Sequence, residues 1–194
     1  VLFIWAEAKA AEPVLPLHLF RNNVFTMTSM ISLITGAAMI GVITFLPVYL
    51  QIATGTSPTA SGLLLVPMTL GIITTSTLAG RYMGRTGKYK ILPIVGMTFL
   101  AIGALLMTRL DVYTSRLAFG VYLFTFGFGM GFIFPVITTA VQNAVPREYL
   151  GTATASGVMF RQIGGSIAVA MFGTIFAARL ASSLPSDMHI SAGE

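Results

Sequence analysis

The stretch Gly80-Arg-Tyr-Met-Gly-Arg-Thr-Gly-Lys-Tyr-Lys90 carries four of the chain's eleven lysines and arginines. Uncharged, mostly apolar runs lie on both sides of it, from Asn22 to Gly80 and from Ile91 to Thr108. A short cationic turn between long apolar segments is typical of a cytoplasmic loop between two membrane spans, because lysine and arginine hold short loops on that side. The three glycines of the stretch predict that the backbone leaves one helix, turns tightly and enters the next.

The composition indicates a membrane protein. Of 194 residues, 55% are apolar and only 9% are charged, whereas about a quarter of a soluble domain is charged. The net charge of +5 comes from residues spread over connectors, so it indicates no nucleic-acid partner. There is no cysteine, and the two histidines, His18 and His189, lie near opposite ends. We therefore expect no metal site, no cofactor and no enzymatic activity.

Five membrane spans are predicted, since about twenty apolar residues cross the hydrocarbon core. Ser57 before Pro58 is a good helix start and begins the second span. Pro47 and Pro67 lie inside the first two spans and are expected to kink them. The third span is the most uniformly apolar and is expected to face lipid. The five spans form an expected bundle over 24–180, at about 24–50, 58–82, 91–108, 117–140 and 152–178.

The ends of the chain are expected to belong to a larger protein. Residues 1–23 resemble the end of a preceding span followed by a cytoplasmic connector, although the alternating Leu15, Leu17 and Leu19 also fit a strand. Residues 181–194 are polar and predict an outer loop that leads to a further span. The chain is therefore expected to be a fragment.

The distribution of basic residues predicts the orientation of the bundle. With the Gly80–Lys90 loop inside, seven basic residues lie inside and three outside, which agrees with the usual cytoplasmic excess. The inside residues are Lys9, Arg21, Arg81, Arg85, Lys88, Lys90 and Arg147, and the outside residues are Arg109, Arg116 and Arg179. Arg161 is left within the fifth span.

The fourth span carries a pattern of close helix packing. Gly127 and Gly131 are one helical turn apart, the spacing that lets two helices approach closely. Pro135 follows Gly131 by four residues, where a proline ring meets the preceding turn. We expect a bent, tightly packed helix, which serves either packing alone or a hinge that moves during function.

The Gly80–Lys90 stretch also resembles the short loop motif of the major facilitator superfamily, which occurs between the second and third helices of each half. Gly80, Arg85, Gly87, Lys88 and Lys90 match that motif. Gly84 stands where the fuller motif has an aspartate, so an Asp-Arg contact at this loop is not expected.

Other stretches resemble one branch of that superfamily, the fourteen-span drug:proton antiporters of the EmrB/QacA type. By this likeness the chain is part of the C-terminal half and holds its ninth to thirteenth spans. The first half and the last span would then be the missing partners. The stretches are 16–25, 45–51, 57–67, 143–147 and 160–166.

The resemblance implies export of hydrophobic, often cationic, compounds driven by protons, at the cell membrane and in contact with lipid. Proton coupling needs a titratable group in the membrane. All six acidic residues fall in connectors or tails, so the proton-carrying acid is expected in the missing half. A same-fold transporter of another solute and a non-transporting membrane fragment remain alternatives.

Arg161 and Gln162 are the predicted residues of the transport cavity or of coupling. Arg161 lies nine residues beyond Thr152, about 13 Å along a helix. Small residues share its helix face, among them Gly164 and Gly165, and could line a cavity or press on another helix. Arg161 either snorkels to the headgroups or faces the cavity and pairs with a carboxylate or carbonyl of the missing half.

Overall fold

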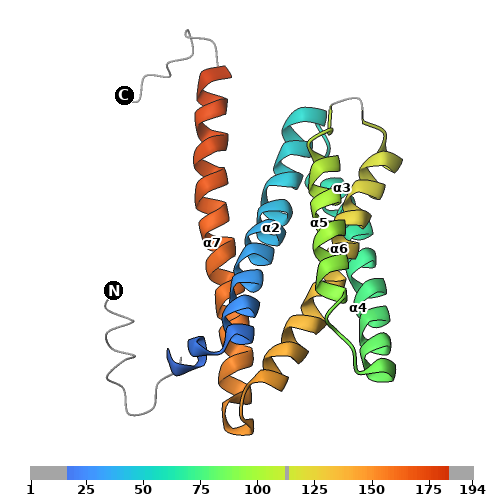
Figure 1. Ribbon diagram of the computed structural model, residues 1–194. Helices are drawn as coiled ribbons and strands as arrows, with labels where there is room; N and C mark the ends of the chain where they lie inside the picture. The colour runs from blue at the N-terminus through green and yellow to red at the C-terminus, as the bar shows by residue number, and fades with distance from the viewer. Residues whose placement is uncertain (1–16, 112–113, 184–194) are drawn as a thin grey trace.

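The computed structural model describes residues 17–111 and 114–183, and every regular element in these ranges is helical. The predicted all-α class is confirmed (Figure 1). Residues 1–16, which hold most of the predicted connector, and 184–194, which hold most of the predicted outer loop, lie outside the described residues. The elements are η1 (Leu17–Arg21), α2 (Asn23–Thr54), α3 (Pro58–Leu63), α4 (Val66–Thr86), α5 (Leu92–Met107), α6 (Arg116–Ala144), η2 (Arg147–Tyr149) and α7 (Leu150–Ser183).

Four stretches of the described chain are long and apolar enough to cross a membrane. The remaining predicted span corresponds to α5, whose 16 residues extend about 24 Å. That length is short of the roughly 30 Å of a hydrocarbon core. The five helices are thus four long apolar candidate spans and one short apolar helix. The four are Asn23–Thr54, Pro58–Thr86, Arg116–Ala144 and Arg147–Arg179.

The expected kink at Pro67 is replaced by a break between two helices. α3 ends at Leu63 and α4 begins at Val66, so Pro67 lies in the first turn of α4. Proline is tolerated in the first turn of a helix, because an N–H at that position has no partner within the helix. The span expected at about 58–82 corresponds to the candidate span Pro58–Thr86, within which the proline ring lies at the start of a second helix.

The glycine-rich stretch 80–90 is mostly helical. α4 continues through Gly80 and Gly84 to Thr86, so the prediction that these two glycines release the backbone was wrong. Both are exposed, and a Cβ at either would meet nothing within 4 Å. Gly87 alone adopts the left-handed conformation there, at φ 64°, and its N–H donates to the Met83 carbonyl. A single glycine therefore ends the helix.

Substituting Gly87 is expected to have a cost that Gly84 does not share. Gly87→Val forces a β-branched residue into the left-handed region and should lower the free energy of unfolding by roughly 1–2 kcal/mol. Gly84→Val is the matched control, since it sits in open helix and should change stability by a few tenths of a kcal/mol. Thermal unfolding of both variants of the full-length protein in detergent measures the difference. Equal melting temperatures would contradict the assigned role of Gly87.

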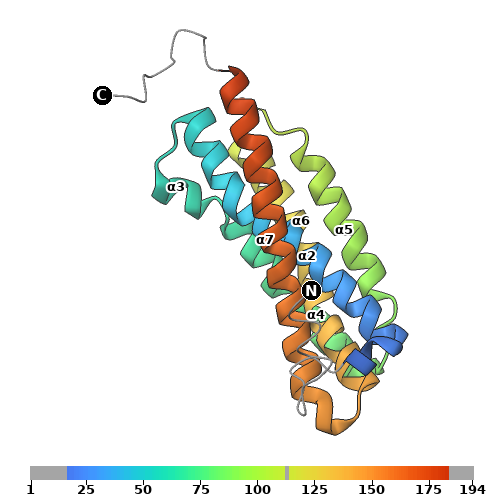
Figure 2. The same cartoon turned by 90° about the vertical axis from the view of Figure 1, so that its left-hand side faces the viewer.

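The helices pack in two groups. α2 and α7 lie side by side along most of their length, and α6 lies between α4 and α5 (Figures 1 and 2). The C-terminal end of α6 meets the N-terminal end of α7 at the bottom of Figure 1, and the two helices diverge toward the top. We call the bottom the basic end, because it carries Arg21, Arg81, Arg85, Lys88, Lys90 and Arg147; the top is the far end.

Glycines set the close approach inside each group. A Cβ added at Gly127 would overlap the Met68 carbonyl of α4, and one at Gly131 would overlap Thr75 on the same helix. Gly129 of α6 meets the backbone of α5 in the same way at Leu100. α6 therefore uses alternate glycines to approach two neighbours at backbone contact.

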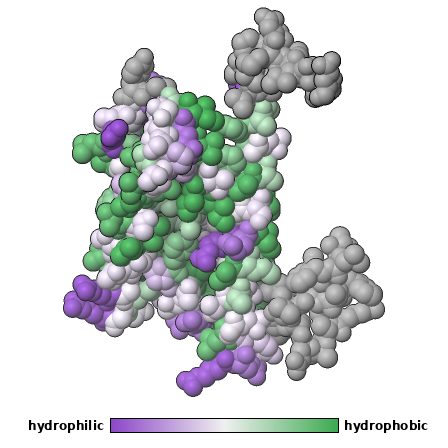
Figure 3. All heavy atoms as spheres, turned by 180° about the vertical axis from the view of Figure 1, so that it is seen from behind, coloured by the Kyte–Doolittle hydropathy of each residue, from purple (hydrophilic) through white to green (hydrophobic). Residues whose placement is uncertain are grey.

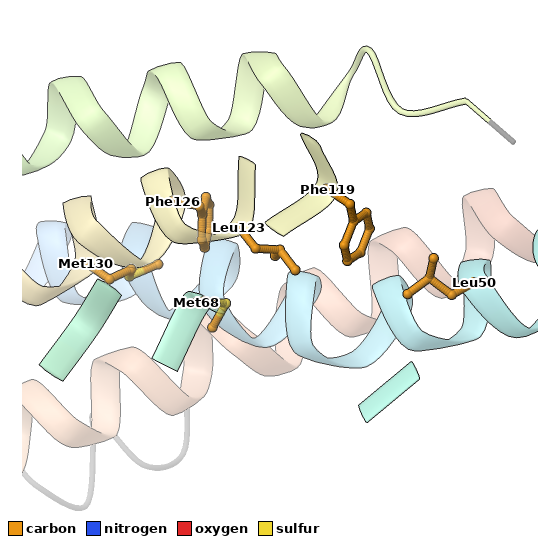
Figure 4. Packing of buried hydrophobic residues seen from close by; sticks show 6 residues of the cluster. All are labelled: Leu50, Met68, Phe119, Leu123, Phe126 and Met130. Carbon is orange, nitrogen blue, oxygen red and sulfur yellow. The ribbon is translucent and has the colours of Figure 1, made fainter. Parts of the chain in front are cut away.

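The core of the second group is apolar and fully packed around α6. Phe126, Leu123 and Met130 have at most 1% of their surface exposed and lie over Met68 of α4 (Figure 4). Closer to the far end, Phe119 lies near Leu50 of α2. Burial of this kind stabilises the bundle by about 1.5–3 kcal/mol per large side chain in water, although lipid reduces that gain.

Candidate functional site

Arg161 lies in a small pocket of mixed polar and apolar lining where α7 meets α2 and α6. Its guanidinium carbon is 5.2 Å from the centre of the Phe134 ring of α6, close enough for a cation–π interaction. The pocket encloses about 50 Å³, enough for about one water molecule. Its polar lining consists of Arg161 together with the hydroxyl-bearing residues Ser32, Thr35, Thr138 and Thr154.

The hydroxyl groups of the pocket are bonded to their own helices. Ser32 donates to the Thr28 carbonyl at 2.8 Å, and Thr154 donates to the Leu150 carbonyl at 2.8 Å. Thr35 and Thr138 donate one turn back in the same manner. Each hydroxyl hydrogen is thereby used, and the oxygen keeps lone pairs that can accept a hydrogen bond. The pocket thus offers Arg161 acceptors and space for water.

No carboxylate of the described residues neutralises Arg161. The acidic side chains in residues 17–111 and 114–183 are Asp111, beyond the far end of α5, and Glu148, in η2 at the basic end. A guanidinium in the interior of a membrane span costs a few kcal/mol of insertion free energy when it lacks a partner. Within the described chain its one specific side-chain contact is the face of Phe134, so the charge remains available to a group outside these residues.

The two predicted site residues of α7 do not share a pocket. Gln162 is exposed and lines a separate shallow groove with Ile40 of α2 and Ser166 of α7. Adjacent residues on a helix point about 100° apart, which separates them onto two faces. Arg161 faces α6, whereas Gln162 lies on the outer side of the α2–α7 pair.

Gly164 and Gly165 lie buried in the contact between α7 and α2. A Cβ at Gly164 would overlap the Leu33 carbonyl, and one at Gly165 would overlap the Ile40 side chain. A Cβ at Gly36 of α2 would likewise overlap the Arg161 carbonyl of α7. Gly36 was not among the predicted packing residues, although the run of small residues Gly36-Ala-Ala38 is a sequence signal for such a contact.

The predicted loop residues all lie at the basic end. Arg81 and Arg85 are on the last turns of α4, while Lys88 and Lys90 follow Gly87, and all four side chains are exposed. Pro135 lies inside α6, next to Phe134, and its role as a hinge stays a prediction. The motif residues and the Arg161 pocket are therefore separate features of the bundle.

The surface has the pattern of a membrane-spanning protein. Strongly hydrophilic atoms gather at the two ends of the face in Figure 3, with a hydrophobic region between them. One hydrophilic patch interrupts that region midway along the face. Within the described candidate spans, Arg161 is the one charged residue that lies away from a helix end. A polar position at mid-depth in a membrane helix is a functional-site hypothesis by default.

The fold and this distribution of charge define a multi-pass helical membrane protein. The sequence pattern of the Major Facilitator Superfamily matches residues 4–169. The chain belongs to the Major Facilitator Superfamily, a family of transporters, and is not an enzyme.

Similar proteins include several whose names refer to multidrug transport or drug resistance. The chain is 42% identical over 188 residues to an uncharacterised MFS-type transporter of Mycobacterium tuberculosis, covering 95% of this chain and 27% of the relative. It is 39% identical to the multidrug transporter protein MdtP of Bacillus subtilis, over 92% of this chain and 33% of that protein. A tetracycline resistance determinant of Streptomyces rimosus is 34% identical, over 92% of this chain and 52% of that protein. The chain thus spans about a quarter to a half of these relatives.

Proposed function

We propose that this chain is part of the C-terminal half of a proton-coupled efflux transporter of the fourteen-span EmrB/QacA type, which exports hydrophobic or cationic compounds by alternating access at the cell membrane. The observation that carries the proposal is the 39% identity with a protein named as a multidrug transporter along nearly the whole chain. In this proposal the basic end faces the cytoplasm, since loops rich in lysine and arginine stay inside.

Arg161 is the proposed cavity residue of this half. It lies in a pocket of mixed lining, away from the lipid-anchoring ends of α7, and has no carboxylate partner among the described residues. A carboxylate or carbonyl of the first half would neutralise it when the two halves approach. The proton-carrying acid is proposed to lie in the first half, because the candidate spans of the described residues hold no aspartate or glutamate away from their ends. Gln162 and the loop residues Gly80–Lys90 are proposed to assist the same cycle.

Transport by the full-length protein tests the proposal. Inverted membrane vesicles that contain the full-length protein should accumulate the fluorescent lipophilic cation ethidium when the interior of the vesicles is made more acidic than the medium. A protonophore should abolish that accumulation, because coupling requires the gradient. Vesicles without the protein are the control. Accumulation that persists after the protonophore would contradict proton coupling, and no accumulation of several lipophilic cations would favour a transporter of another solute.

A further inference from the structure

Asn22 connects two helices that are far apart in the sequence. Its side-chain oxygen Oδ1 accepts a hydrogen bond from the Val24 N–H at 2.9 Å and so caps the start of α2. Its Nδ2 donates to the carbonyl of Ala144 at 2.8 Å, the last residue of α6. One amide therefore satisfies a free donor at one helix start and a free acceptor at another helix end.

The chemistry of these two partners fixes the orientation of the amide. The Val24 N–H can only donate and the Ala144 carbonyl can only accept, so Oδ1 and Nδ2 cannot exchange places. Aspartate or serine at position 22 would cap α2 equally well. Aspartate has no donor for Ala144 when ionised and would place a negative charge against the carbonyl end of α6. The serine hydroxyl can donate, but it ends one atom short of the position of Nδ2. The asparagine thus serves the cross-helix bond.

Apolar side chains close the same junction. Leu19 of η1 is 4% exposed and packs with Phe25, Val141 and Ala153 from α2, α6 and α7. Phe20 meets the rings of Phe25 at 5.0 Å and of Phe160 at 5.9 Å, both edge to face. We call Asn22, Leu19 and Phe20 with these partners the basic-end junction.

Away from this junction α7 diverges from α6, whereas α2 stays packed against it. Toward the far end, an apolar groove of about 550 Å³ is lined by residues of both groups. Val42 and Phe45 of α2 line it on one side, and Met107, Leu110 and Phe126 from α5, α6 and the chain between them line the other. The close glycine contacts described above lie within each group and not between them. At the far end α2 still packs against α6, with Leu50 and Phe119 in one buried cluster, whereas α7 stands apart from α6 there (Figure 1).

We propose that the Asn22–Ala144 hydrogen bond is a conformational latch that holds the α2–α7 pair against α4, α5 and α6 at the basic end. Breaking it lets the basic ends of the two groups separate. The inference concerns movement within one half of the protein, and it stands whether or not the proposed substrates are correct.

The distance between the two groups at the basic end tests the latch. Spin labels placed by Met27→Cys on α2 and Thr86→Cys on α4, both at exposed positions, report that distance in the full-length protein by pulsed electron resonance. Asn22→Asp and Asn22→Ser should each raise the ratio of separated to joined molecules roughly fivefold, the factor that corresponds to one ordinary hydrogen bond. The effect of aspartate should be the larger.

Asn23→Ser is the matched control, because Asn23 is exposed and adjacent and its side chain makes no hydrogen bond in the described chain. Its distance distribution should equal that of the wild type. If Asn22→Asp does not fold, Asn22→Ser decides, since it keeps the helix cap. A wild-type distribution in Asn22→Ser, or an equal change in Asn23→Ser, would overturn the latch. Neither measurement requires transport, so a failed efflux assay leaves this result separate.

Discussion

Arg161→Leu is expected to abolish export by the full-length transporter at normal expression. Leucine keeps apolar contact with Phe134 but removes the guanidinium from the pocket between α2, α6 and α7. If that charge pairs with a group of the first half, its loss should reduce the transport rate by about tenfold or more, the effect of roughly 1.4 kcal/mol on a barrier. Initial rates of ethidium export, normalised to the amount of protein in the membrane, measure it.

Three further variants separate the roles that Arg161 could have. Arg161→Lys should retain part of the activity, because lysine keeps the charge and loses the planar fork. Phe134→Leu should reduce transport less than Arg161→Leu, since only the cation–π contact is removed. Gln162→Leu changes the other face of α7 and should reduce transport less than Arg161→Leu, because it removes no charge. Wild-type export by Arg161→Leu would show that the residue is a membrane-depth anchor and that the proposed cavity role is wrong.

The sequence predicted the helices well because charge and hydropathy act over long stretches. Uninterrupted apolar runs must be helical in a bilayer, where every backbone group needs an internal partner. Local chemistry decided the details that were missed. Gly80 and Gly84 were expected to turn the chain, yet exposed glycines cost a helix only about 1 kcal/mol each and α4 continues through them. Gly87 ends α4 because it alone is left-handed there.

The candidate site could be predicted only one residue at a time. Arg161 is conspicuous in the sequence because it is a charge within an apolar run. Its contact with Phe134 depends on how α6 and α7 cross, and no short-range pattern relates two residues on different helices. Gln162 was grouped with Arg161 by adjacency, whereas the helical turn places it in another groove. Packing geometry, which side-chain types do not specify, separates the two.

The Asn22 junction illustrates the same limit. An asparagine before an apolar run is a recognisable helix cap, so half of its role can be read from the sequence. The other half lies 122 residues away at the Ala144 carbonyl. Any residue type supplies a carbonyl, and for that reason the partner has no sequence signal.

Gly127→Val is expected to destabilise the bundle strongly, because Gly127 lies at backbone contact with α4. A Cβ at position 127 would overlap the carbonyl, the carbonyl carbon and the Cα of Met68. These are backbone atoms of α4, so they cannot rotate away as a side chain can. Over-packing of this kind costs about 1–3 kcal/mol where neighbours can shift. At Gly131 a Cβ would overlap both the Thr75 hydroxyl and the Ile72 carbonyl, so this position also lies at backbone contact with α4.

Gly120 provides the matched control on the same helix. A Cβ at Gly120 would lie 3.6 Å from the Pro67 Cγ, an ordinary van der Waals distance. Gly120→Val should therefore keep the melting temperature of the full-length protein in detergent near that of the wild type, while Gly127→Val should lower it or prevent recovery of folded protein. Both variants replace a helical glycine with valine, so the change in helix propensity is the same in both and cancels when their melting temperatures are compared. If the two variants have the same melting temperature, α4 and α6 are not held at backbone contact through Gly127. The α4–α6 contact would then not fix the position of α6, which carries Phe134 next to Arg161.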